Sequence, residues 1–177
     1  MQRPETSEYD PYYSLYVNQV EDGDILETLV QSVAETVTLL RDVPPEWVRY
    51  RYEPDKWTLG EVLGHIIDTE RVFAYRALAI ARGETAELPG MDQDEYAAAS
   101  NAGEREMESL LDELKAVRGA SLALFANLDP AVDTRAGRAS GCPFTVRTFP
   151  WVVAGHEIHH RKVIVERYLE PLRAGEL

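Results

Sequence analysis

The chain has 177 residues, enough for one domain with a sizeable core, and 45% of them are hydrophobic while 28% are charged. This balance is ordinary for a soluble globular protein. The net charge of −13 argues against nucleic-acid binding, which needs a basic surface. No run of about 18 apolar residues and no N-terminal signal pattern is seen, and one cysteine, Cys142, cannot form an internal disulfide. We therefore expect a cytoplasmic protein without a membrane or nucleic-acid partner.

The N-terminal region is expected to be an arm, residues 1–20, followed by a single helical domain, residues 21–177. Residues 1–10 are polar and irregular. The tyrosines that end and follow this stretch would pack the arm on its own domain or on a partner subunit; they are Tyr9, Tyr12, Tyr13 and Tyr16. A homodimer is the oligomer that we expect.

The first two helices are predicted from periodicity and from stop signals. Apolar residues recur every three or four positions over residues 24–41, and Pro44-Pro45 ends this helix. The connector 43–57 carries more aromatic residues than a solvated loop needs, so we expect it to fold back over the bundle. A capping box, Thr58-Leu59-Gly60-Glu61, starts a second helix that runs to about Arg82 and ends at Gly83.

The sequence of the second half of the chain predicts two further helices. A helix of 25 residues is about 37 Å long, whereas 20 loop residues reach roughly 66 Å, so the connection 83–103 can cross the whole bundle. The second and third helices are then expected to run parallel. The third spans about 104–128, a loop follows Asp129-Pro130, and the fourth spans about 145–169. Without strand-like alternation, the fold class is all-α, a four-helix bundle with long connections and one parallel helix pair.

Three of the four histidines are candidate metal ligands. His156 and His160 lie one turn apart on one helix face, and His65 lies in the second helix. Three neutral imidazoles on one divalent ion leave a coordination position free, as in a catalytic centre. Gly64 and Gly155 precede two of these ligands, and glycine inside a helix costs about 1 kcal/mol relative to alanine. We expect the two glycines to let the ligand-bearing helices approach each other closely.

The same histidines have other interpretations. An HxxxH pair also occurs on helix surfaces and in hydrogen-bonded cores. His156-Glu157-Ile158-His159-His160 satisfies the HExxH signature of zinc proteases, whose extended form needs glycine at 163 and histidine at 166. Those positions hold Val163 and Glu166, and no sheet is predicted, so we reject a protease.

The arrangement resembles the DinB/YfiT-like family of metalloenzymes, four-helix bundles in which one histidine of the second helix joins an HxxxH pair of the last. The resemblance covers about 57–169. It rests on residues 56–70, on 77–83 leading into Leu88-Pro89-Gly90, and on Ala154-Gly155-His156-Glu157-Ile158-His159-His160. It implies that His65, His156 and His160 hold a divalent ion such as zinc or nickel.

The resemblance also suggests an activity. Relatives look like transferases and isomerases that use a low-molecular-weight thiol such as bacillithiol or mycothiol. We therefore expect a metal-dependent transferase or hydrolase acting on a small electrophile, with a role in the stress response. A bound ion would lower the pKa of water or thiol, so no protein nucleophile is required, and we interpret Cys142 as structural or incidental.

Three further residues are candidates for supporting or catalytic roles. Asp68 and Glu157 would accept a ligand N–H or act as general base, or would form surface salt bridges. His159 would orient a ligand, relay a proton or simply occupy the surface; we favour the first role. Arg71 and Arg76, on the helix of His65, would hold an anionic substrate or face solvent in ion pairs.

Three functions remain open on the sequence alone. The first is a metal-dependent enzyme, favoured by the all-imidazole ligand set. The second is a non-catalytic metal-binding stress protein, which predicts a fourth protein ligand or a closed site. The third is a helical partner-binding module without metal, which predicts that His65 lies far from His156.

Overall fold

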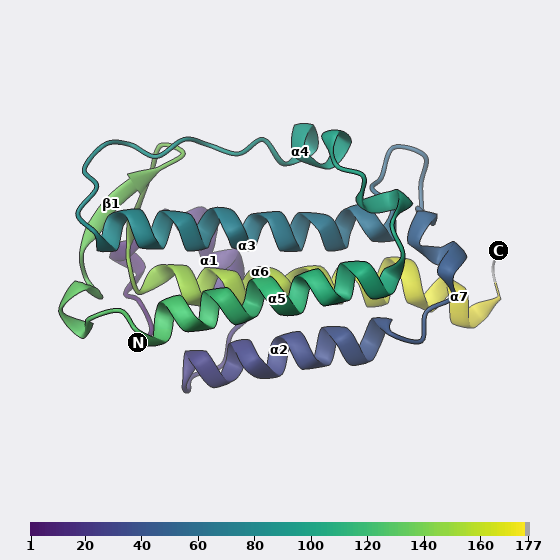
Figure 1. Ribbon diagram of the computed structural model, residues 1–177, viewed down its shortest axis with the longest axis horizontal. Helices are drawn as coiled ribbons and strands as arrows, with labels where there is room; N and C mark the ends of the chain where they lie inside the picture. The colour runs from purple at the N-terminus through teal and green to yellow at the C-terminus, as the bar shows by residue number, and fades with distance from the viewer. Residues whose placement is uncertain (176–177) are drawn as a thin grey trace.

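The computed structural model describes residues 1–175 and forms a four-helix bundle with a small hairpin at one end (Figure 1). The long helices are α2 (Ile25–Leu40), α3 (Leu59–Ala81), α5 (Met107–Ala126) and α6 (Thr148–Val163). The α6 helix continues as a π-helical segment, η6 (Ile164–Leu169), and as α7 (Glu170–Ala174). The remaining elements are η1 (Thr6–Glu8), η2 (Pro11–Tyr13), α1 (Ser14–Val17), η3 (Pro45–Arg49), α4 (Gln93–Ala99), η4 (Ala102–Glu104), η5 (Pro130–Val132), β1 (Ala136–Ala139) and β2 (Cys142–Thr145).

The four helices are arranged as two parallel pairs. Neighbouring helices in the ring are α2 and α6, α6 and α3, α3 and α5, and α5 and α2. In Figure 1, α3 and α5 run in one direction while α2 and α6 run in the other. The predicted parallel pair, α3 with α5, is therefore confirmed, and α2 with α6 forms a second. The connection from α3 passes back over the whole bundle before α5 begins, as its length predicted (Figure 1).

A capping box and a glycine mark the two ends of α3. Thr58 Oγ1 accepts from the Glu61 amide at 3.1 Å, and the Glu61 carboxylate accepts from the Thr58 amide at 2.6 Å. This is the predicted capping box, which satisfies two otherwise free backbone donors. At the other end Gly83 has φ +94°, a conformation that glycine adopts without steric cost.

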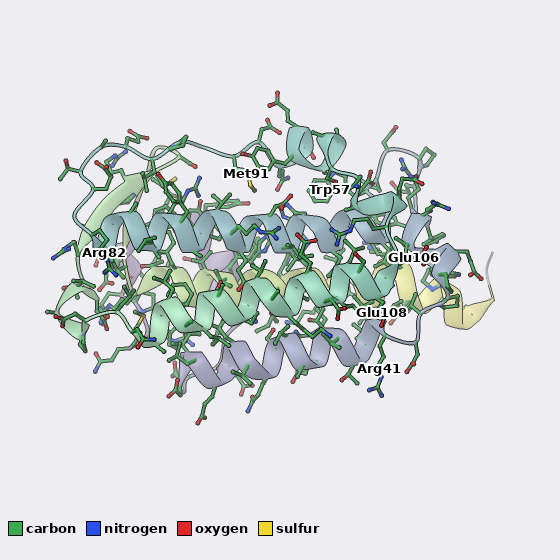
Figure 2. All side chains as sticks on the ribbon, in the orientation of Figure 1. Arg41, Trp57, Arg82, Met91, Glu106 and Glu108 are labelled. Carbon is green, nitrogen blue, oxygen red and sulfur yellow. The ribbon has the colours of Figure 1, made fainter. Side chains whose placement is uncertain are left out.

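The core fills the bundle and extends under the N-terminal arm. Tyr9, Tyr13 and Tyr16 are buried and belong to the same apolar cluster as Phe144 and Trp151. The arm thus packs on its own domain. Charged side chains such as Arg41 and Arg82 point away from the bundle (Figure 2). No helix in the part of the chain that the structure describes is long and apolar enough to cross a lipid bilayer.

The loop expected after Asp129-Pro130 contains a β-hairpin instead. Strands β1 and β2 pair antiparallel, with Ala139 opposite Cys142. The two-residue turn Ser140-Gly141 has φ values of 53° and 76°, which match the turn type that suits the twist of a hairpin. Four-residue strands are too short for alternation to be read from sequence, and the Ser-Gly pair was the available turn signal.

The two glycines before the ligand histidines allow close packing, although not between the ligand helices. A Cβ on Gly64 would lie 2.6 Å from Ala102 Cβ in η4, and one on Gly155 would lie 2.0 Å from the Tyr16 carbonyl oxygen in α1. The expectation that they bring the second and fourth helices together was therefore wrong. They let short N-terminal and connecting segments press on α3 and α6 from outside.

A buried ion network joins the four long helices. Arg118 of α5 donates Nε and Nη2 to the Glu70 carboxylate on α3 at 2.9 and 2.8 Å, and Nη2 also donates to Glu157 on α6 at 2.8 Å. Its Nη1 donates to the Leu29 carbonyl of α2 at 2.7 Å. Burial alone would lower the pKa of Arg118, but the Glu157 and Glu70 carboxylates outweigh it and raise that pKa. Arg118 is therefore charged, and each of its three side-chain nitrogens donates a hydrogen bond inside the core.

Replacing Gly155 with alanine tests the contact between α1 and α6. The added Cβ meets backbone that cannot rotate away, so Gly155→Ala should lower the free energy of unfolding by roughly 1–3 kcal/mol in urea denaturation. Gly119 is the matched control, because a Cβ there meets nothing within 4 Å. Gly119→Ala should raise stability by up to about 1 kcal/mol. Equal effects at both positions would contradict the close contact.

Replacing Arg118 tests the ion network. Arg118→Met leaves two buried carboxylates without their cation, so we expect a loss of about 3–5 kcal/mol in the free energy of unfolding. The control is Lys115→Met, which removes the exposed ion pair with Asp112 and should cost less than about 1 kcal/mol. A loss at Arg118 no larger than at Lys115 would refute the network's role.

Candidate metal centre

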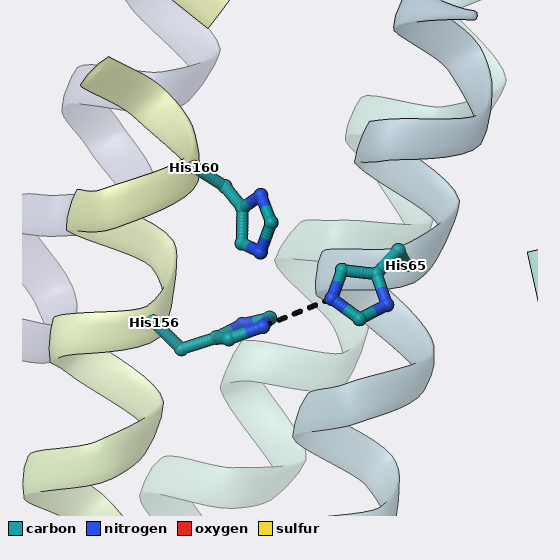
Figure 3. Close-up of side chains that lie close together, drawn as sticks. All are labelled: His65, His156 and His160. Carbon is teal, nitrogen blue, oxygen red and sulfur yellow. Dashed lines mark hydrogen bonds between the residues drawn. The ribbon is translucent and has the colours of Figure 1, made fainter. Parts of the chain in front are cut away.

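Side chains from two antiparallel helices bring three imidazoles together inside the bundle. His65 comes from α3, and His156 and His160 come from successive turns of α6 (Figure 3). The Nε2 atoms of His65 and His156 are 3.0 Å apart, and one ring nitrogen of each of the three lies within 4.8 Å of the others. Two nitrogens about 2.0–2.1 Å from one zinc ion are about 3.3 Å apart in a tetrahedron. The donor set therefore fits a single divalent ion.

The three rings are neutral at physiological pH. His65 and His156 are only 7% and 5% exposed. Burial lowers the pKa of His65 to about 4 and that of His160 to about 3, with the neighbouring histidines adding to the shift at His160. Burial also lowers the pKa of His156, and His160 and His65 reinforce that effect. Metal ligation requires unprotonated imidazole, so these rings are in the right form without a proton having to leave.

Two residues outside the triad orient His65. Thr69 Oγ1 lies 3.4 Å from His65 Nδ1. When Nδ1 carries the proton and donates to this hydroxyl, the Nε2 lone pair faces the other two histidines. The Trp57 ring packs against His65 with 4.8 Å between centroids. Thr69 is a site residue that the sequence analysis missed; its spacing of four residues from His65, which puts it on the same side of the helix, was the available signal.

Asp68 and Glu157 have other partners. The Asp68 carboxylate accepts from Arg71 Nη1 at 3.3 Å on the surface, which matches the salt-bridge interpretation. Glu157 is fully buried, so the surface alternative is wrong for it. Its two carboxylate oxygens accept from Thr36 Oγ1 at 2.7 Å and from Arg118 at 2.8 Å. Because both oxygens of Glu157 are engaged in the ion network, we assign it no proton transfer.

His159 lies beside the triad without joining it. The group of potential ligands found among residues 1–175 contains His65, His156 and His160 only. The His159 ring is half-buried, 5.1 Å from the His160 ring and 5.7 Å from Tyr16, measured between centroids. Burial lowers the pKa of His159. Its contact with His160 is that of a packing neighbour.

Two cavities reach the triad from different sides. One, of about 200 Å³, is lined by both His65 and His156; we call it the Arg76 cavity because Arg76 forms part of its wall. The other, of about 400 Å³, is lined by His160 and Tyr168; we call it the His160 cavity. Gln93, at the start of α4, lines both. His65 and His156 are thus buried, His160 is partly exposed, and cavities reach all three, unlike a sealed structural metal site.

Arg71 and Arg76 differ in their surroundings. Arg71 is exposed and bridges Asp68 and Glu113, so it faces solvent in ion pairs. Arg76 is 3% exposed and lines the cavity that also contains His65 and His156. Of the two arginines singled out from the sequence, one therefore lies at the site.

Comparisons with known proteins agree with this geometry. The family model of the DinB superfamily matches residues 28–164. Among solved structures the chain is similar to YfiT from Bacillus subtilis, described as a probable metal-dependent hydrolase with an unusual four-helix bundle topology. The TM-score is 0.70 at 16% sequence identity, over 92% of this chain and 98% of YfiT. A search of curated proteins finds no match. Since the family model covers most of its length, the chain belongs to the DinB superfamily.

Proposed function

We propose that this protein is a divalent-metal-dependent enzyme whose ion is held by His65, His156 and His160, and that it transfers a low-molecular-weight thiol to a small electrophile. The observation that carries the proposal is the convergence of three neutral imidazoles at a point that two cavities reach. Zinc and nickel both suit an all-imidazole donor set. A bound ion would supply Lewis acidity that lowers the pKa of a thiol or water molecule toward neutrality.

The protein itself would position the ligand histidines and shield them from water. Thr69, by accepting from Nδ1, would hold His65 in the tautomer that directs the Nε2 lone pair inward, and Tyr16 packs on His156 with 5.2 Å between ring centroids. A thiol in one cavity and an electrophile in the other would meet at the triad. The thiol sulfur then forms the bond to the electrophilic carbon, the leaving group departs with its electron pair, and the thiol proton passes to solvent.

A protein thiol is unsuited to the same step. Burial raises the pKa of Cys142, which keeps it in the weakly nucleophilic thiol form at neutral pH. It also lies in β2, on the hairpin, and lines neither cavity. This supports a nucleophile that enters from solution.

Hydrolysis is the second candidate, because YfiT is described as a probable metal-dependent hydrolase. The same site would then use water in place of a thiol. A non-catalytic metal-binding role is less well supported, because it calls for a closed site or a fourth protein ligand. Homodimerisation, a cytoplasmic location and a role in the stress response stay predictions.

Metal content tests the ligand assignment. Untagged protein saturated with zinc or nickel and then desalted should retain about one ion per chain by elemental analysis. His65→Ala and His160→Ala should each lose most of it. His159→Ala is the matched control, a neighbouring histidine of α6 outside the triad, and should retain it. Unchanged metal content in both triad variants would refute the assignment.

Catalysis is tested by comparing zinc-loaded with metal-stripped protein. Bacillithiol, mycothiol and glutathione are each incubated with chlorodinitrobenzene, and an activated ester is incubated without thiol. We expect at least one thiol to react about tenfold or more faster with loaded protein, corresponding to about 1.4 kcal/mol of transition-state stabilisation. Acceleration of ester hydrolysis alone would establish the hydrolase instead. Equal rates for loaded and stripped protein in every assay would contradict an enzyme of either kind.

A further inference from the structure

Arg76 is a buried cation without a counter-charge. Its Nη2 donates to the Pro89 carbonyl at 2.8 Å and to Ser140 Oγ at 2.7 Å, both neutral acceptors. Its Nε is buried and has no hydrogen-bond partner. Among residues 1–175 no carboxylate forms an ion pair with it. The Phe73 ring lies 5.5 Å from Arg76 Cζ but carries no negative charge, so this guanidinium lacks the anionic partner that a buried cation calls for.

Comparison with Arg118 shows that Arg76 lacks a carboxylate partner. Both arginines are at least 97% buried, yet Arg118 is paired with two carboxylates and Arg76 with none. Burial lowers the pKa of Arg76, whereas the net shift at Arg118 is upward. Arg118 does not line either cavity that reaches the triad, whereas Arg76 lines one of them. The unpaired charge therefore lies where a ligand can reach it.

The hairpin holds the Arg76 side chain in place. Ser140, which accepts from Nη2, is the first residue of the hairpin turn and has φ +53°, an uncommon conformation for a residue other than glycine. The turn is anchored to the segment that includes Pro89, because the Ser140 amide donates to the Leu88 carbonyl at 3.1 Å. The two acceptors thus belong to one connected unit, which pre-orients the guanidinium before any ligand arrives.

We propose that Arg76 binds a carboxylate of the molecule that enters the Arg76 cavity, and so selects carboxylate-bearing substrates for the metal centre. This inference rests on the proposed function and narrows its substrate class. The carboxylate supplies the negative charge and the acceptor that the guanidinium lacks. In a chain with a net charge of −13, such a local cation is also what draws an anion to the site.

The spacing along α3 defines the shape of the ligand. Arg76 follows His65 by eleven residues, about 16 Å along the helix axis. Both side chains lean toward the helix N-terminus and that of Arg76 is the longer, so the guanidinium lies less than about 16 Å from the triad. The cavity wall includes apolar Val72 and Phe73 and polar Thr69 and Gln93. The ligand is therefore elongated, with a carboxylate at one end, the reacting atom at the other and a body that tolerates both apolar and polar neighbours.

Binding of hexanoate to metal-free protein tests the carboxylate site by itself. Calorimetry should show that hexanoate binds at least about tenfold more tightly than hexanamide, a neutral ligand of the same shape. This difference is expected for a charge-assisted hydrogen bond. In NMR spectra of the wild-type protein, hexanoate should shift the Arg76 Nε–H proton downfield and hexanamide should not. This second measurement needs no variant, so it does not depend on how well a variant folds.

Variants test whether Arg76 causes the preference for hexanoate over hexanamide. Arg76→Gln should remove the preference for hexanoate, and Arg76→Lys should retain part of it. Arg71→Gln, the exposed arginine on the same helix, should behave as wild type. Equal binding of the two probes to wild type, or a preference that persists in Arg76→Gln, overturns the proposal. Tighter binding of inorganic phosphate than of hexanoate overturns the carboxylate assignment in favour of phosphate.

Measurements on zinc-loaded protein distinguish a failure of this proposal from a failure of the proposed function. With zinc present, 6-mercaptohexanoate should bind more tightly than hexanoate, and His65→Ala should abolish that gain while keeping the preference for carboxylate. If zinc gives no gain but hexanoate still requires Arg76, the metal assignment fails and the anion site stands. If zinc gives the gain but 6-mercaptohexanol binds equally well, the anion site fails and the metal assignment stands.

Discussion

One guanidinium fixes how the four long helices meet. Arg118 of α5 hydrogen-bonds to residues of α3, α6 and α2, so the rotation of each helix about its axis is restricted at this level of the bundle. Glu157, which it binds, follows His156 directly, and Glu70 follows the His65 partner Thr69. With Glu157 turned toward α5, the preceding histidine is turned toward α3. The charge network and the three-histidine site therefore share α3 and α6, and the first restricts the orientation of the second.

The two buried arginines show how the same residue type serves stability and recognition. Arg118 has its carboxylates within the chain, so its charge is satisfied on folding. Arg76 has two neutral acceptors, the face of the Phe73 ring and an unpaired Nε–H, so within the chain its charge has no anionic partner. A protein that needed Arg76 only for packing would be more stable with an apolar side chain there. The free-energy cost of burying the Arg76 charge without an anionic partner, more than its position in a cavity, indicates a ligand.

The sequence predicted the features that depend on local periodicity. The four helices follow from apolar residues every three or four positions, and the start of α3 follows from the Thr58 and Glu61 pair. His156 and His160 could be placed on one helix face because a helix face is a local property, whereas their convergence with His65 was an expectation from the family resemblance. Burial of Arg118, Arg76 and Glu157 could not be predicted, because charged residues are on the surface by default and only tertiary contacts reveal their partners. The hairpin was missed because its strands are too short for a period.

The parallel arrangement of α3 and α5 determines which segment covers the three-histidine site. Two parallel neighbours cannot be joined by a short turn, so the chain has to travel back along the bundle between them. That return segment runs alongside α3 and carries α4, which contacts α3 (Figure 1). Gln93 of this segment lines both cavities, Met91 lines the Arg76 cavity and Asp94 the His160 cavity. Figure 2 shows the side chains of Met91, which belongs to this segment, and of Trp57 near α4. The topology therefore builds the outer wall of the site from a connection, which can vary in sequence without disturbing the helices that hold the histidines.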